Sequence, residues 1–106
     1  MGRYLTSTLN YATTNVVTGT SVTAAVNQRI LCTAGGITIT LPAAATENDT
    51  IQVIDISGTA GSSNITVARN GHEIQNSASD LTIDINNASP VLVYSGVTYG
   101  WVLAGS

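Results

Sequence analysis

The feature that most constrains the fold of this chain is the alternation of apolar and polar side chains in short runs. Residues 37–41 read ITITL, which places three aliphatic side chains on one face and two threonines on the other. Residues 64–69 and 81–85 alternate in the same way, whereas residues 51–57 are partly apolar on both faces, as in a central strand. Because alternation with period two is typical of half-buried strands, these runs predict an all-β protein.

Turn-forming residues separate the runs about every 8–14 residues. They lie at residues 34–36, 57–64, 70–71 and 85–90. The last two runs, residues 90–95 and 98–104, flank a short turn at Gly96 and predict a β-hairpin. This spacing predicts a single-domain antiparallel β-sandwich of the jelly-roll kind, with a small barrel as the alternative.

Signals for helices are weak. Residues 41–49 could form one helical turn that begins at Pro42, since proline is favoured at the first helical position. Residues 23–30 are the other candidate, but their β-branched neighbours favour a strand.

The first 28 residues differ from the rest because their apolar side chains are thinly spread among Thr and Asn. We expect either edge strands of the sandwich or an extended arm that packs on a neighbouring chain, ahead of a sandwich domain at residues 29–106. Arg3, Tyr4 and Leu5 would anchor such an arm, because Arg and Tyr are favoured at protein–protein contacts.

Charged side chains are scarce. The chain has three arginines, no lysine and six carboxylates, which gives a net charge of −3. It therefore lacks the basic patch that nucleic acids and anionic membrane surfaces attract, and we expect neither as a partner. No apolar run approaches the roughly 18 residues of a transmembrane helix, and the start of the chain lacks the pattern of a signal peptide. These observations predict a protein that is made and folded in a cytoplasm.

Cys32 lies in the apolar run RILCT, with no basic residue that would activate its thiol close by on its C-terminal side. We expect a small buried hydrophobic side chain.

The segment NGHEIQNSASDLTIDI, residues 70–85, gathers the single histidine, His72, with Glu73, Asp80 and Asp84. A metal site or an acid/base cluster would use such groups, but the second histidine of an H-E-x-x-H helix and the spacing of a calcium loop are both absent. We expect His72 in a turn or edge strand, Asp80 as a local backbone acceptor and Asp84 on the outward face of a strand.

Catalysis has little support in the chain. A Ser-His-Asp or Cys-His arrangement would have to use His72, and no G-x-S-x-G elbow occurs. Glu73 and Asp84 could be paired as glycosidase carboxylates, although any two of the six carboxylates could be paired on paper. We therefore expect no enzyme, no cofactor and no metal ligand.

Aromatic side chains gather in the C-terminal hairpin. Tyr99 and Trp101 share a strand face, and Tyr94 is expected near them across the turn. We expect Trp101 to anchor the core. Exposed tyrosines at positions 94 and 99 would instead be able to stack on a sugar ring.

Residues 30–104 also follow a particular order of motifs. An Ile/Thr strand comes first and ends in Leu41-Pro42-Ala43. A segment with spaced apolar residues and a glycine follows, at Ile65, Val67, Gly71 and Ile74. The strand Leu81-Thr82-Ile83 comes next, and a hairpin with Val91, Val93 and Trp101 closes the order. This order resembles a β-module of tailed-bacteriophage virion proteins. His72 and the aspartates are not part of the pattern.

The resemblance implies a trimeric β-sandwich of the kind found in tail fibres, tailspikes and capsid decoration (cement) proteins. A fibre needs an attachment domain and a shaft, whereas this chain has room for one module and an arm. The expected function is therefore capsid decoration. A homotrimer on the outer surface of the virion would bridge neighbouring major capsid subunits and stabilise the head, with Arg3, Tyr4 and Leu5 as candidate capsid contacts. The alternative is a distal tail-fibre or tailspike module that binds a receptor or host-surface glycans through Tyr94 and Tyr99.

Overall fold

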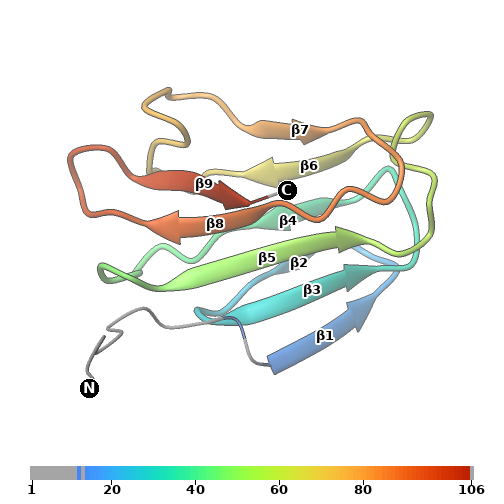
Figure 1. Cartoon of the computed structure of the whole chain (residues 1–106), viewed down its shortest axis with the longest axis horizontal. Helices are drawn as coiled ribbons and strands as arrows, with labels where there is room; N and C mark the ends of the chain where they lie inside the picture. The colour runs from blue at the N-terminus through green and yellow to red at the C-terminus, as the bar shows by residue number, and fades with distance from the viewer. Residues whose placement is uncertain (1–11, 13, 106) are drawn as a thin grey trace, which may run out of the picture.

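The chain crosses from one β-sheet to another after each of its first five strands (Figure 1). The computed structural model describes residues 12 and 14–105, and this part contains no helix, so no helical segment in it could span a membrane. The strands are β1 (Thr14–Thr18), β2 (Val22–Thr23), β3 (Gln28–Cys32), β4 (Thr38–Thr40), β5 (Thr50–Asp55), β6 (Ile65–Ala68), β7 (Leu81–Ile83), β8 (Val91–Tyr94) and β9 (Trp101–Gly105).

Both sheets are mixed. The five-stranded sheet has the order β1-β3-β5-β8-β9, and the four-stranded sheet has the order β2-β4-β6-β7. Strands β1, β3 and β5 are parallel to one another, as are β2, β4 and β6, whereas β7, β8 and β9 each pair in antiparallel fashion. The prediction of an all-β domain is confirmed, but the prediction of an antiparallel sandwich is wrong for the first six strands.

The error has a physical reason. Alternation with period two tells which side chains face the core, but it does not tell the direction of the next strand in the same sheet. Parallel neighbours need a long crossover connection, which is usually a helix. Here a strand of the opposite sheet supplies the crossover, so spacings typical of hairpins connect strands of different sheets.

The smaller predictions have mixed outcomes. The hairpin is confirmed, since β8 and β9 pair directly. The ambiguous segment 23–30 contains the end of β2, a turn and the first three residues of β3, and residues 41–49 form turns instead of a helical turn. Strands β1 and β2 lie at the edges of the two sheets. Arg3, Tyr4 and Leu5 lie outside the described residues.

The core lies between the sheets and consists of in-register aliphatic rows. Ile30 and Val53 are paired neighbours in the five-stranded sheet, and Ile39 and Val67 are paired neighbours in the four-stranded sheet. All four are fully buried and belong to one cluster that both sheets share. Such stacking of branched side chains on adjacent strands stabilises the sheets through apolar burial and close packing.

An asparagine shapes one corner between the sheets. Asn27 has a φ of 64°, a left-handed conformation that Asn tolerates better than most residues. Its N–H donates to the Thr50 carbonyl at 2.8 Å, and its side-chain oxygen accepts from the Thr50 N–H at 3.0 Å. The corner before β3 is thereby joined to the start of β5.

The segment after β6 covers the start of the outer edge of β9. The Trp101 N–H donates to the Glu73 carbonyl at 2.7 Å, and the Gln75 N–H donates to the Trp101 carbonyl at 2.8 Å. One step further, the Gln75 side chain accepts from the Leu103 N–H at 2.9 Å. Covering an edge in this way limits uncontrolled pairing with other strands.

This close approach predicts the effect of a substitution at Gly100. A Cβ on Gly100 would collide with the Glu73 carbonyl oxygen, and the φ of Gly100 is 71°. Gly71 has a φ of 87°, but a Cβ there would meet nothing within 4 Å. We expect Gly71→Ala to lower the free energy of unfolding by about 1–2 kcal/mol through backbone strain alone, and Gly100→Ala to lower it by at least about 2 kcal/mol more, because backbone must move.

Urea denaturation of the two variants measures both values. Equal losses at the two glycines would show that residues 73–75 do not pack against the start of β9.

Candidate functional site

His72 lies in a bend after β6, where Asn70 and Gly71 turn the chain with positive φ. Its Nε2 is 2.7 Å from the Ala43 carbonyl oxygen, and its Nδ1 is 3.2 Å from the Tyr94 hydroxyl. A carbonyl can only accept, so Nε2 carries the proton, and the Tyr94 hydroxyl then donates to Nδ1. Both ring nitrogens are therefore hydrogen-bonded within the protein, and His72 connects the turn at Ala43 to β8.

A row of three aromatic rings runs from His72 into the core. The His72 and Tyr94 rings pack edge to face, with centroids 5.1 Å apart, and the Tyr94 and Trp101 rings do the same at 5.3 Å. Trp101 is fully buried, so the prediction that it anchors the core is confirmed. Its indole N–H has no acceptor among the described residues, so packing alone holds the ring.

The carboxylates near His72 in sequence do not join it in space. Asp80 accepts a hydrogen bond from the Arg69 N–H at 2.9 Å, across the turn and not locally. Asp84 is exposed and points outward from the end of β7, as predicted. In residues 12 and 14–105, no group of three or more His, Cys, Asp or Glu side chains is close enough to hold a metal ion.

We expect the His72–Tyr94 contact to be measurable as a coupling free energy. Replacing His72 by Ala removes the imidazole with its ring contact, whereas replacing Tyr94 by Phe removes only the hydroxyl, so the two changes made singly and together isolate the hydrogen bond between them. Thermal or urea unfolding should give a coupling of about 0.5–1.5 kcal/mol in the double-mutant cycle. Additive losses would mean that the two side chains stabilise the fold independently.

A second polar centre, Asp55, was missed in the sequence. It is fully buried at the end of β5 and accepts hydrogen bonds from the Ser57 hydroxyl at 2.6 Å and from the Gly58, Ala60 and Asn87 N–H groups at 3.0–3.1 Å. Burial by itself raises the pKa of this carboxyl, but the Ser57 hydroxyl and the three N–H groups outweigh it and lower the pKa below 3.8. Asp55 thus fixes the loop after β5 and the loop after β7 with one side chain.

This arrangement predicts a loss of stability in acid. The pKa of Asp55 is lower in the folded chain than in the unfolded chain, so its contribution is fully present above the ordinary pKa of 3.8 and is lost as the pH falls through the folded value. We expect Asp55→Asn to be destabilised by about 1–3 kcal/mol at neutral pH, and to lose less stability than the parent chain between about pH 5 and pH 2.

Chemical denaturation across this pH range is the measurement. Ser57→Ala serves as a control that removes one donor and keeps the carboxylate. If Asp55→Asn and the parent chain lost the same free energy in acid, other carboxyls would be responsible.

Cys32 is fully buried in β3, as predicted. Burial, and secondarily the negative charge of Asp55, raise the pKa of its thiol to about 11. A thiol of this kind is inert at neutral pH.

The two tyrosines proposed as sugar contacts are not together on the surface. Tyr94 is 3% exposed and points into the core, whereas Tyr99 is 57% exposed in the turn before β9. The stacking surface is therefore a single ring, that of Tyr99.

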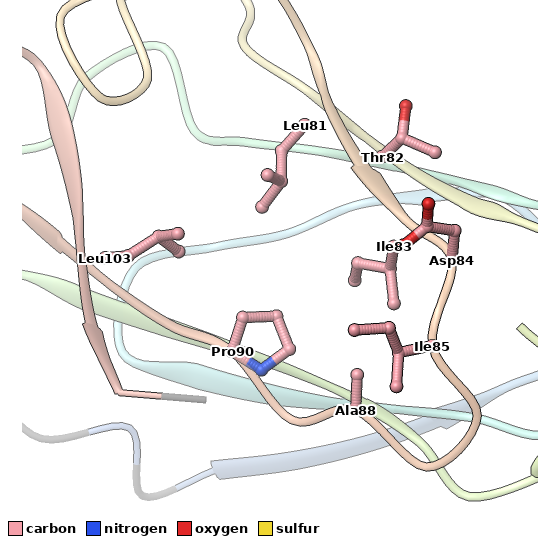
Figure 2. A pocket seen from close by; sticks show the side chains of 8 residues that line it. All are labelled: Leu81, Thr82, Ile83, Asp84, Ile85, Ala88, Pro90 and Leu103. Carbon is pink, nitrogen blue, oxygen red and sulfur yellow. The ribbon is translucent and has the colours of Figure 1, made fainter. Parts of the chain in front are cut away.

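An open apolar groove lies between β7 and β9 and is here called the β7–β9 groove (Figure 2). It encloses about 160 Å³ and is lined by Leu81, Thr82, Ile83, Asp84, Ile85, Ala88, Pro90 and Leu103. Figure 2 shows the aliphatic side chains facing a common centre, while Thr82 points away from it. Ile85 and Leu103 are 68% and 39% exposed, so the mouth of the groove is apolar.

A second apolar surface covers part of the outer face of the five-stranded sheet. Val17, Leu31 and Ile54 are paired in register across β1, β3 and β5, and all three point away from the core. Beside them runs a polar row in which Arg29 donates to the Gln52 and Asn15 side-chain oxygens, at 3.2 Å each. We call Val17, Arg29, Leu31 and Ile54 the outer patch.

Comparison with known proteins identifies no relative. No protein-family model matches the chain, and no curated protein is similar enough to count as a match. The candidate surfaces therefore have to be interpreted from their own chemistry and from the motif order in the sequence.

Proposed function

We propose that the chain is a structural virion protein that forms a homotrimer on the phage head and bridges neighbouring major capsid subunits. The observation that carries this proposal is a pair of surfaces rich in aliphatic side chains that the described residues leave partly exposed, the outer patch and the β7–β9 groove. Val17 and Ile85, one from each, are 65% and 68% exposed. Contiguous apolar surface of this kind marks sites of protein association.

The side chains with reactive chemistry support a structural role. His72 holds Ala43 and Tyr94 together, Asp55 fixes two loops, and Cys32 fills the core. Each of these groups has a stabilising task in the fold.

Trimer formation also suits the size of the chain. A domain of about 100 residues buries only some 60–70% of the surface of its unfolded chain, so its stability is marginal. Association of copies through the aliphatic surfaces would add apolar burial at about 25 cal/mol per Å². A trimer placed over a junction of capsid subunits would then attach through several weak contacts at once, which multiplies their effect.

The assignment to a phage virion is supported by the order of motifs in residues 30–104. In the fold, Leu41-Pro42-Ala43 follows β4, Gly71 and Ile74 follow β6, and the remaining motif residues lie in β6, β7 and the β8–β9 hairpin. Residues 2–10 include Arg3, Tyr4 and Leu5, which we propose as the capsid contacts. No nucleic acid, membrane, metal or cofactor takes part in this proposal.

The test combines mass and binding. Native mass spectrometry of the purified chain should show three times the chain mass of 10.8 kDa. The trimer should decorate shells of the cognate capsid protein, and a variant without residues 2–10 should stay trimeric but lose at least about tenfold in shell binding, because it loses one contact in each of three arms.

A monomer that binds no shells would refute the proposal. Full shell occupancy by the shortened variant would leave the trimer in place but exclude the anchoring role of Arg3, Tyr4 and Leu5.

A further inference from the structure

Arg29 carries a charge that its neighbours in the described part of the chain do not neutralise. Its guanidinium donates to the Gln52 side chain, to the Asn15 side chain and, at 3.3 Å, to the Ala12 carbonyl, and all three acceptors are neutral. A guanidinium has five N–H donors, and neutral acceptors of the described residues take three of them. A half-buried cation whose described partners are all neutral is suited to pair with a carboxylate from outside the chain.

The surroundings of Arg29 are aliphatic on one side. Leu31 lies two residues further along β3 on the same outer face, and its in-register neighbour on β1 is Val17, at 65% exposure. The outer patch therefore presents one projecting aliphatic side chain and one cation within a few strand positions of each other.

The β7–β9 groove presents the opposite combination. It is an apolar hollow of about 160 Å³, and an apolar cavity of about 150 Å³ is enough to hold a benzene molecule. A single branched aliphatic side chain would therefore fit. Asp84 stands at the rim, exposed, and forms no hydrogen bond or ion pair with the other described residues.

We propose that the outer patch of one copy docks into the β7–β9 groove of a second copy, with Val17 entering the groove and Arg29 pairing with Asp84. Charge complementarity is the argument for a second copy: within the part of the chain that the structure describes, Arg29 has only neutral partners, and Asp84 is a carboxylate without a side-chain partner beside an apolar hollow. This inference rests on the proposed function, because it names the surfaces through which the trimer would form.

A contact of this kind allows three copies to close into a ring. The two surfaces are different, so the contact is heterologous, and each copy keeps one patch and one groove for further copies. A heterologous contact closes when the rotation between copies divides a full turn, and three copies would satisfy all patches and grooves.

The experiment is native mass spectrometry of four full-length proteins at the same low micromolar concentration: the parent chain, Arg29→Glu, Asp84→Arg, and the double variant. Each single reversal places like charges opposite each other and should lower the trimer association constant at least about tenfold. The double variant restores opposite charges in swapped positions and should recover the trimer.

Two further variants and a measurement of folding complete the experiment. Glu47→Arg reverses an exposed carboxylate in the turn before β5, outside both surfaces, and it should leave the trimer intact. Circular dichroism of each variant reports whether the β-fold is retained, and Ile85→Asp, which places a charge at the mouth of the groove, should disrupt the trimer without touching Arg29.

The outcomes are distinguishable. A monomeric parent chain would contradict the trimer itself and with it the proposed function. A trimeric parent whose charge-reversed variants remain trimeric, or whose double variant stays monomeric, would overturn the Arg29–Asp84 pairing alone. Variants that stay trimeric but lose shell binding would assign the surfaces to the capsid and also overturn the inference.

Discussion

The structure depends on two rows of aliphatic side chains that stack in register along the sheets. They are Val16, Ile30 and Val53 across β1, β3 and β5, and Val22, Ile39 and Val67 across β2, β4 and β6. Each row takes one residue from each of three parallel strands, and the chain reaches successive members by passing through the opposite sheet. The other features follow from this winding: the Asn27 corner, the antiparallel strands that complete each sheet, and the outward Val17–Leu31–Ile54 row.

The sequence predicts the strands better than their directions. Alternating runs such as 37–41 and 81–85 locate β4 and β7 closely, because burial of one face imposes period two on the side chains. The parallel arrangement could not be read in the same way, since an inward aliphatic residue packs equally well in either strand direction. Trp101 and Cys32 were predictable because a large aromatic and a thiol in apolar runs are usually buried.

The hydrogen-bond partners of the polar groups could not be predicted from the sequence. Proximity in sequence suggested a cluster of His72 with Glu73, Asp80 and Asp84, but the partners of His72 are Ala43 and Tyr94, which are distant in sequence. The role of Asp55 was not predicted, because residues 51–57 have the pattern of a strand. An aspartate two residues before a serine and three before a glycine is nevertheless a turn signal. Its fourth donor, from Asn87, depends on tertiary structure and has no local signal.

The wound β-fold is suited to an assembly role. The in-register pairing of β1, β3 and β5 aligns side chains on the outer face of the sheet as well as on the inner face. The outward row of Val17, Leu31 and Ile54 is therefore a continuous aliphatic surface suited to packing. The loops that Asp55 fixes follow β5 and β7, and the second of them ends the groove at Ile85 and Ala88. Rigid loops would keep the groove open for a partner side chain, because fewer conformations are lost on docking.

The most direct test of this account is oxidative cross-linking between copies. With Val17→Cys and Ile85→Cys in one chain, disulfides should form between copies and yield a covalent trimer, because each new thiol would lie at the docked surface. Cys32 would not compete, since it is buried and its thiol pKa is raised to about 11. The same experiment with Val17→Cys and Val97→Cys, at the distant β8–β9 turn, should yield no covalent trimer. Equal cross-linking in both pairs, or none in the first, would contradict the account.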